Sequence, residues 1–145
     1  MSTLDRAIAI AAAAHAGQVN KAGEPYILHP LRVMLSLASE SERVVGVLHD
    51  VVEKSPWTLS ALKSEGFTET IIGAIDSVTR RQDEEYDDFV RRSAANEIGR
   101  AVKFADLRDN MHLVGIKAPS PDDNKQMEKY RRAERILAAW PLSPG

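Results

Sequence analysis

SERVVGVLHDVV, residues 41–52, is the stretch of sequence that decides the fold. As a helix it would be apolar on more than one face, which is typical of a helix buried inside a protein rather than one that faces solvent. The apolar residues in question are Val44, Val45, Val47 and Leu48. We therefore expect a helix over residues 41–52 at the centre of the molecule, with His49 and Asp50 inside it.

Helical periodicity continues on both sides of this stretch, and no segment alternates strictly between polar and apolar residues as a half-buried strand does. Capping residues such as Thr68 begin helices and glycines such as Gly17 end them, and an ordered loop is expected over residues 18–30. The predicted fold is all-α, a bundle of about seven or eight helices. They cover about residues 3–15, 30–38, 41–52, 58–66, 68–81, 83–90, 97–113 and 122–139.

Length and composition indicate how many domains the chain forms and which kinds of binding site it can have. A chain of 145 residues and 16.0 kDa corresponds to one domain, so residues 1–145 are expected to form a single compact bundle. The chain has no cysteine, so any metal must bind to nitrogen and oxygen ligands. Nineteen Lys and Arg residues against twenty-one Asp and Glu residues argue against a general nucleic-acid-binding protein.

No run of apolar residues in the sequence is long enough to span a membrane, and the alanine-rich start is not a convincing signal peptide. A cytoplasmic protein that does not bind membranes is therefore expected. The sequence leaves the oligomeric state open, a homodimer included.

His49 and Asp50 are adjacent ionisable residues in the most apolar helix that we expect, and their burial requires a partner that offsets the loss of water. A divalent cation would be such a partner. Glu53 lies four residues after His49 and three after Asp50, so all three side chains can project toward one side of a helix. These residues form one part of a candidate site.

Another part of this candidate site lies far along the chain. Lys103, Asp106 and Asn110 are spaced three and four residues apart on a second apolar helix, and His29 comes directly before Pro30 on the ordered loop. Three unrelated segments thus carry residue types that bind metal ions and phosphate groups. That agreement supports a site for a metal ion and phosphate groups, which a single His-Asp pair would not support by itself.

The motifs of these segments, taken together, resemble the HD-domain metal-dependent phosphohydrolases. They are GEPYILHP over residues 23–30, LHDVVE over 48–53 and VKFADLRDN over 102–110. Within that superfamily the chain is similar to the hydrolase domain of the RelA/SpoT proteins and to the stand-alone small alarmone hydrolases. The resemblance implies an all-α HD domain that uses Mn²⁺ to remove pyrophosphate from the 3′ position of ppGpp and pppGpp.

The resemblance also implies roles for individual residues. The metal ligands would be His29, His49, Asp50 and Asp106. Two imidazoles and two carboxylates suit Mn²⁺ or a similar divalent ion and leave coordination positions for water and a phosphate oxygen. Glu53 would orient or deprotonate the attacking water. The substrate contacts would come from Lys21, Tyr26, Lys103 and Asn110.

Two positions differ from the family pattern, although we keep both in the predicted site. Asn20, a substrate-binding position, stands where the family has an arginine that packs against guanine, so the base preference is open. Lys54, a catalytic position, stands where the family has the second acid of a Glu-Asp pair. Either Glu53 acts alone, or another carboxylate helps it, or the leaving group differs. Lys54 could also bind a substrate phosphate.

Three hypotheses about function follow. The leading one is a nucleotide pyrophosphohydrolase that acts on ppGpp or on a related alarmone such as ppApp. A second keeps the metal and changes the substrate, giving a phosphomonoesterase that acts on another phosphorylated nucleotide such as NADPH. A third is a catalytically weak nucleotide sensor in which Lys54 blocks the activation of water.

Other conspicuous residues have simpler interpretations. His15 ends the first helix and is expected to cap it. Of the arginine pairs at 80–81 and 91–92, at most one is expected to receive distal phosphates. The acidic residues at 83–88 and the charged residues between 125 and 135 are expected to form solvated helix faces.

Overall fold

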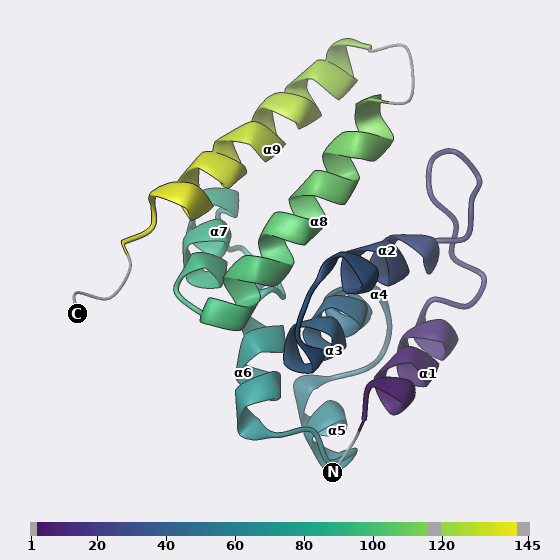
Figure 1. Ribbon diagram of the computed structural model, residues 1–145. Coiled ribbons are helices and arrows are strands. Elements are labelled where there is room, and N and C mark those ends of the chain that lie inside the picture. The colour runs from purple at the N-terminus through teal and green to yellow at the C-terminus, as the bar shows by residue number, and fades with distance from the viewer. Residues whose placement is uncertain (1–2, 116–119, 142–145) are drawn as a thin grey trace.

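The central apolar stretch forms helix α3 (Glu40–Leu48) in the computed structural model, in which residues 3–115 and 120–141 are described (Figure 1). Over these residues the all-α prediction is confirmed: nine helices are present, no strand is formed, and Val19 and Pro25 make one isolated bridge. The other helices are α1 (Leu4–Ala14), α2 (Leu28–Ser36), α4 (Val51–Lys54), α5 (Leu59–Ser64), α6 (Glu69–Ser77), α7 (Tyr86–Ala94), α8 (Glu97–Gly115) and α9 (Pro121–Ala139).

Several helices begin where capping chemistry predicts. The side chains of Thr3, Thr58 and Thr68 each accept a hydrogen bond from the backbone N–H three residues on, at the starts of α1, α5 and α6. Ser39 and Ser120 do the same for α3 and α9, and an acidic side chain in the first turn bonds back to each of these caps. The starts of these five helices therefore follow from local sequence.

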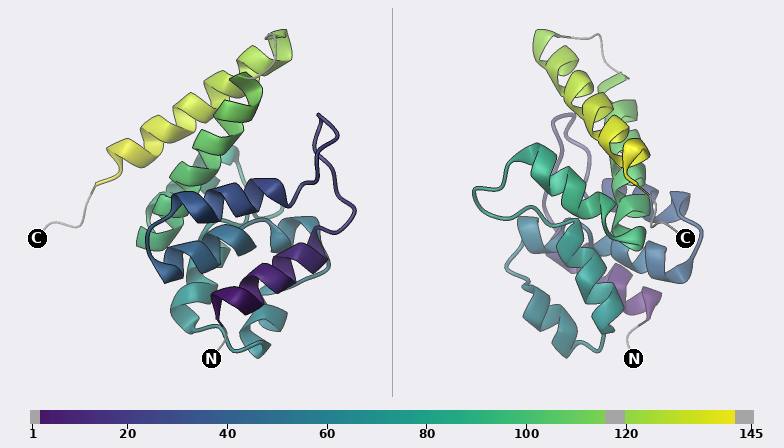
Figure 2. Two further views of the ribbon diagram at one scale, coloured as in Figure 1. Left: turned by 45° about the vertical axis from the view of Figure 1, so that its right-hand side comes forward. Right: turned by 90° about the vertical axis from the view of Figure 1, so that its left-hand side faces the viewer.

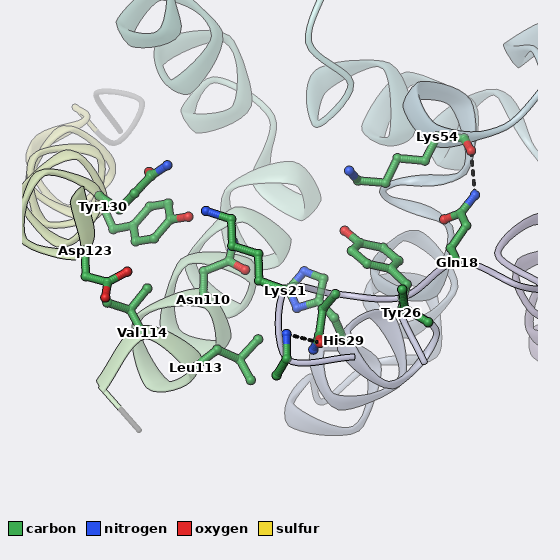
Figure 3. A pocket seen from close by; sticks show the side chains of 14 residues that line it. Gln18, Lys21, Tyr26, His29, Lys54, Asn110, Leu113, Val114, Asp123 and Tyr130 are labelled. Carbon is green, nitrogen blue, oxygen red and sulfur yellow. Dashed lines mark hydrogen bonds between the residues drawn. The ribbon is translucent and has the colours of Figure 1, made fainter. Parts of the chain in front are cut away.

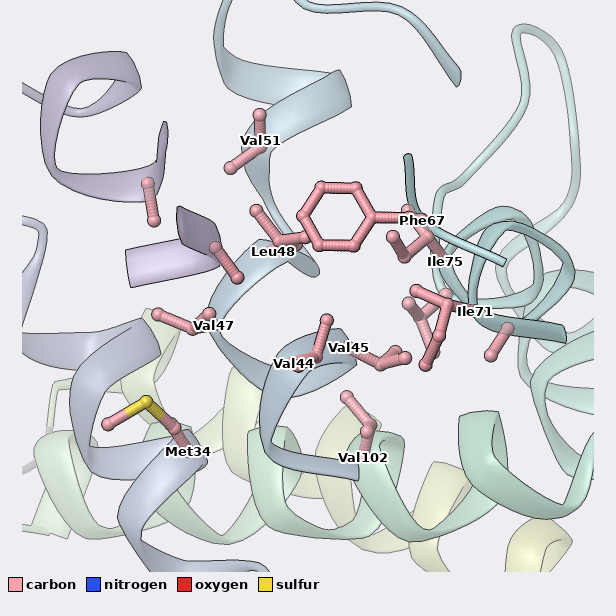
Figure 4. Close-up of a cluster of buried hydrophobic side chains, with 14 of the residues drawn as sticks. Met34, Val44, Val45, Val47, Leu48, Val51, Phe67, Ile71, Ile75 and Val102 are labelled. Atoms are coloured by element: carbon pink, nitrogen blue, oxygen red, sulfur yellow. The ribbon is translucent and has the colours of Figure 1, made fainter. Parts of the chain in front are cut away.

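The larger hydrophobic core surrounds α3 (Figure 4). Val45, Val47 and Leu48 are fully buried, as is Val51 at the start of α4. Because α3 packs against α1, α2, α6 and α8, several of its faces meet other helices, which explains its apolar composition. Each such side chain contributes about 1.5–3 kcal/mol through burial. The central helix thereby holds the residues at its carboxyl end in a fixed position.

A second, smaller hydrophobic cluster joins α7, α8 and α9. It consists of the buried side chains of Val90, Ala94, Leu107, Ala133 and Leu137. In the views of Figure 1 and Figure 2, α8 extends beyond the body formed by the earlier helices and α9 runs back alongside it. Few apolar side chains therefore attach α9 to the rest of the molecule.

The helix predicted over residues 41–52 is in fact broken. α3 ends at Leu48 and α4 begins at Val51, and between them Asp50 has φ −105° and ψ −1°, where a regular helix has ψ of about −42°. The break divides one expected helix into two and accounts for the ninth helix. It also places His49 and Asp50 at a junction rather than inside a helix.

The start of α2 also differs from the prediction. His29 lies in the first turn of α2 and not on the preceding loop, and Pro30 is the third residue of the helix rather than the first. A proline fits anywhere in the first turn, because the backbone N–H groups there have no partner within the helix. Pro30 therefore predicted the first turn of the helix correctly, but not the residue at which the helix begins.

Candidate active site

The four predicted metal ligands come from two helices and from the junction between two others. His29 lies in the first turn of α2, His49 and Asp50 join α3 to α4, and Asp106 lies in the middle of α8. Contacts between α2, α3 and α8 bring these distant segments together. One ligand atom from each of His29, His49 and Asp106 lies within 4.8 Å of the others, and all three residues are buried.

The two imidazole rings are oriented by their outer nitrogens. Nδ1 of His29 lies 2.6 Å from a carboxylate oxygen of Asp109, and Nδ1 of His49 lies 2.6 Å from the carbonyl oxygen of Gly46. Because both partners are acceptors, each Nδ1 carries a hydrogen and donates a hydrogen bond to its partner. The Nε2 atoms both face Oδ1 of Asp106, at 2.9 Å and 3.2 Å. This donor set fits a divalent cation that prefers nitrogen and oxygen ligands.

Asp50 stands at the edge of the same cluster. Its Oδ2 lies 3.2 Å from Nε2 of His49 and 3.8 Å from Nε2 of His29, and it accepts a hydrogen bond from the hydroxyl of Tyr26. Burial, followed by the nearby Asp50 carboxylate, strongly raises the pKa of Tyr26. Tyr26 therefore remains a neutral donor that holds Asp50 in place.

The charges of this cluster favour a cation at its centre. Burial opposes protonation of His49, but the carboxylates of Asp50 and Asp106 outweigh it and raise the pKa of His49 well above its usual value. Burial also opposes ionisation of the two acids. Even so, His49 lowers the pKa of Asp50, and Lys103 and His49 lower that of Asp106. Both carboxylates stay ionised and attract positive charge, which a divalent ion would supply in place of protons.

Glu53 and Lys54 follow the cluster on α4. The carboxylate of Glu53 accepts a hydrogen bond from the backbone N–H of Arg80 at 2.6 Å. Burial raises the pKa of Glu53, although the Arg80 N–H works in the opposite direction. The amino group of Lys54 lies 5.0 Å from the centre of the Tyr26 ring, a distance at which the ring face attracts its charge.

Lys103 and Asn110 both contact the carboxylate of Asp106. The buried amino group of Lys103 lies 3.0 Å from Oδ2, and the amide nitrogen of Asn110 donates to Oδ1 at 3.2 Å. Burial opposes the charge on Lys103, but Asp106 outweighs it and raises the pKa of the amine. Lys103 is therefore a buried cation beside the candidate metal position.

The loop between α1 and α2 forms one wall of an outer cavity of about 770 Å³. Figure 3 shows Tyr26 and Lys54 on one side of this cavity, with Tyr130 of α9 on the other. Lys21 and Asn20 also line it. The side-chain oxygen of Asn20, however, accepts hydrogen bonds from the N–H groups of Ala22 and Glu24 at 2.9 Å and 3.0 Å. That oxygen shapes the loop.

An inner cavity of about 340 Å³ adjoins His29, His49 and Asp106, which we call the metal-ligand cluster. Besides predicted residues, its lining includes side chains of α7 and α9 that were not expected at the site. They are Tyr86, Phe89, Lys129 and Tyr130. No local pattern marks these residues, because they reach the cavity only through the docking of α7 and α9 against α8. Asp109, also missed, could have been found from its position three residues after Asp106.

The arginines at 80–81 and 91–92 were the candidates for binding distal phosphates. Of these four, only Arg80 lines the inner cavity. Arg81 pairs with Asp76, Arg91 with Asp88, and Arg92 with Glu84. His15 caps α1 as expected, and its Nδ1 contacts the side-chain oxygen of Gln18 at 2.9 Å.

Curated proteins with related sequences are long compared with this chain. A probable GTP pyrophosphokinase of Mycobacterium leprae is 30% identical over 95% of this chain and 19% of its own length. Two proteins named guanosine-3′,5′-bis(diphosphate) 3′-pyrophosphohydrolase match as well. The one from Haemophilus influenzae is 33% identical over 83% of this chain, and the one from Aquifex aeolicus is 32% identical over 96%. The chain spans about a fifth of the length of these relatives.

The fold is similar to that of a solved structure described by the words "A metazoan ortholog of SpoT hydrolyzes ppGpp and plays a role in starvation responses". The TM-score is 0.73 at 19% sequence identity, and the match covers 94% of this chain and 84% of the other. No protein-family model matches the chain. Among the described helices, none has both the length and the apolar character needed to cross a lipid bilayer.

Proposed function

Since the chain belongs to the RelA/SpoT-type HD hydrolase domains, we propose that it is a metal-dependent hydrolase that releases pyrophosphate from the 3′ position of ppGpp or of a related alarmone such as ppApp. The observation that carries the proposal is the convergence of His29, His49 and Asp106, from three segments far apart in the sequence, within 4.8 Å. The names of the relatives support it. The proposal includes a single domain over residues 1–145 and a cytoplasmic location.

In this proposal His29, His49, Asp50 and Asp106 hold the metal ion, for which Mn²⁺ is our first choice. The ion would polarise a phosphoryl oxygen and lower the pKa of a bound water. Asp109 and the Gly46 carbonyl keep the two Nε2 atoms directed toward it, which is how hydrogen-bonded neighbours tune metal ligands in proteins.

Glu53 acts as the general base, and the reaction is a hydrolysis. The water oxygen attacks the phosphorus bonded to the 3′ oxygen, and the bond between that phosphorus and the 3′ oxygen breaks. Glu53 accepts a proton from the water, the departing 3′ oxygen takes up a proton from solvent, and Glu53 later releases its proton to solvent. The products of ppGpp are therefore GDP and pyrophosphate. Burial near the cluster raises the pKa of Glu53, which suits a carboxylate that must accept a proton.

The remaining predicted residues would bind the substrate. Lys103 compensates phosphate charge from inside the cavity, and Lys54 does so from the entrance. Lys21, Tyr26 and Asn110 line the outer cavity, whose volume of about 770 Å³ suits a nucleotide. Asn20 contributes through the shape of the loop, since its side-chain oxygen is already bonded to that loop.

The proposal is tested by metal removal. Protein treated with a chelator should leave ppGpp intact, and added Mn²⁺ should restore the release of pyrophosphate. Asp106→Ala should lose both metal binding and turnover, because Asp106 lies against both imidazoles. Turnover by metal-free protein, or by the Asp106→Ala variant, would contradict the proposal.

A second candidate function rests on Lys54, which places a positive charge beside Glu53 where the family pattern has an acid. With that change the enzyme would be a phosphomonoesterase for a nucleotide such as NADPH. Ion-exchange analysis of parallel incubations with ppGpp, ppApp and NADPH separates the candidates. Orthophosphate from NADPH alone supports the second function. Tight binding without any product supports a nucleotide sensor.

A further inference from the structure

With a divalent ion bound, the inner cavity would carry more positive charge than one phosphate group can balance. The charged side chains that line it, apart from its histidines, are four cations and three carboxylates. They are Lys54, Arg80, Lys103 and Lys129 against Asp50, Glu53 and Asp106. A bound divalent ion would add two further positive charges. A single phosphate group brings a charge of only about −1.5 to −2 at neutral pH. The cavity is therefore suited to a ligand with more than one phosphate.

Three of these charges gather around the ring of Tyr86 on α7. The amino group of Lys129 lies 4.1 Å from the ring centre, the guanidinium carbon of Arg80 lies 5.6 Å away, and the amino group of Lys103 lies 5.7 Å away. Such contacts with the ring face attract each cation. The cations also repel one another, and burial together with Arg80 and Lys103 lowers the pKa of Lys129. A bound anion would relieve this repulsion.

Two of the three cations have no acidic partner. Lys103 pairs with Asp106 at 3.0 Å. Within the part of the chain that the structure describes, neither Arg80 nor Lys129 has a carboxylate at salt-bridge distance, and the guanidinium of Arg80 donates only to the backbone oxygen of Glu84. Among the described residues, no carboxylate pairs with either side chain, so both are left to contact a ligand in the inner cavity.

Lys103 connects the two ends of the cavity. It contacts Asp106 at the metal-ligand cluster and also lies near the Tyr86 ring, 5.7 Å from the ring centre. Lys103 therefore contacts both groups, and side chains of both groups line the same inner cavity of about 340 Å³.

We propose that Lys129 and Arg80, gathered around Tyr86, bind the outer phosphate of a diphosphate whose inner phosphate lies at the His29–His49–Asp106 cluster. The inference rests on the proposed function and sharpens it, since it assigns the outer phosphate of the substrate to two named side chains. It also assigns a role to Lys129, on the helix face that the sequence alone assigns to solvent. The ion pair between Arg132 and Asp87 ties that part of α9 to α7, which carries Tyr86.

The test is the binding of inorganic pyrophosphate and of orthophosphate, measured by calorimetry at fixed ionic strength. Lys129→Gln should weaken pyrophosphate binding by about 10- to 100-fold, as expected for a charge-assisted contact, and should change orthophosphate binding much less. Lys129→Arg should retain most of the affinity for pyrophosphate. Lys125→Gln is the matched control, because Lys125 is exposed on the same helix and does not line the inner cavity.

Unchanged pyrophosphate binding in Lys129→Gln, or an equal loss for both anions, would overturn the inference. This result does not depend on turnover. If the wild-type protein hydrolyses ppGpp but Lys129→Gln binds pyrophosphate normally, the proposed function stands and the outer-phosphate site does not. If no alarmone is hydrolysed but pyrophosphate binds through Lys129, the outer-phosphate site stands and the proposed function does not.

Discussion

Asp109 shows how one residue outside the predicted site acts on the chemistry inside it. Its carboxylate accepts a hydrogen bond from Nδ1 of His29 at 2.6 Å and is itself held by Arg32 at 2.8 Å and 3.1 Å. The Nε2 atom of His29 is thereby left to face Asp106. Carboxylates in this position orient a histidine ligand and increase its basicity.

Substitution of Asp109 should therefore weaken metal binding. Asp109→Ala should raise the Kd for Mn²⁺ by about 10- to 100-fold, measured by calorimetric titration of the metal-free protein. The Kd of Asp109→Asn for Mn²⁺ should lie between those of Asp109→Ala and the wild type. An amide oxygen can still accept the hydrogen bond from Nδ1, but it lacks the negative charge. Equal affinity in all three proteins would show that Asp109 does not position His29.

Glu53 should control both the rate and its dependence on pH. Glu53→Gln removes the proton acceptor and should lower kcat by about 10²- to 10⁴-fold, in assays of pyrophosphate release. Because burial raises the pKa of Glu53, the wild-type rate should fall on acidification at a higher pH than the ordinary glutamate value of about 4.3. The carboxylate is the active form, so activity is retained above its pKa and lost below it.

A matched control for this variant is Glu128→Gln, since Glu128 is exposed on α9 and does not line the inner cavity. It should leave both kcat and the pH profile unchanged. A Glu53→Gln variant with wild-type kcat would remove Glu53 from the reaction.

At the scale of helices, the sequence predicts which segments are helical better than where they break. Thr58 and Thr68 cap their helices as expected, because a cap depends on contacts within a few residues. The break at His49 and Asp50 depends instead on distant partners, since Asp50 bonds to Tyr26 and His49 faces Asp106. Local periodicity carries no information about such contacts.

Gly99 and Gly73 form a matched pair for testing helix packing. A Cβ added at Gly99 of α8 would stand 2.0 Å from the hydroxyl oxygen of Ser77, at the end of α6, whereas one added at Gly73 of α6 would meet no atom within 4 Å. Gly99→Ala should lower the free energy of unfolding by about 1–3 kcal/mol through overpacking. Gly73→Ala should raise it by about 0.5–1 kcal/mol, since alanine is the better helix former.

Chemical denaturation of both glycine variants measures these changes. Opposite signs for the two substitutions are the expected result. A stabilising Gly99→Ala would mean that α6 and α8 do not approach as closely as the structure shows.

At the scale of the whole molecule, α9 completes the site. The sequence predicts a helix over about residues 122–139, and Leu137 of this helix is buried. The sequence does not predict that Lys129 and Tyr130 line the inner cavity, because that depends on how α9 docks against α7 and α8. Whether a charged helical residue faces solvent or a cavity is decided by packing rather than by periodicity.

The docking of α9 should depend on a few apolar side chains. Leu137→Ala should lower the free energy of unfolding by about 2–5 kcal/mol, because Leu137 is fully buried in the second cluster. Leu35→Ala is the control, since Leu35 is 67% exposed, and should change stability by less than about 0.5 kcal/mol. Similar denaturation midpoints for the two variants would contradict this account of how α9 is held.

The central claim is that the site removes pyrophosphate as one unit and needs a metal ion to do so. Phosphorus-31 NMR tests it directly, with ppGpp incubated with protein and Mn²⁺ and the reaction stopped by excess chelator before the spectrum is taken. We predict pyrophosphate and GDP in equal amounts, no orthophosphate, and no product from Asp106→Ala. Orthophosphate as the released product, or pyrophosphate formed without any metal ion, would contradict the claim.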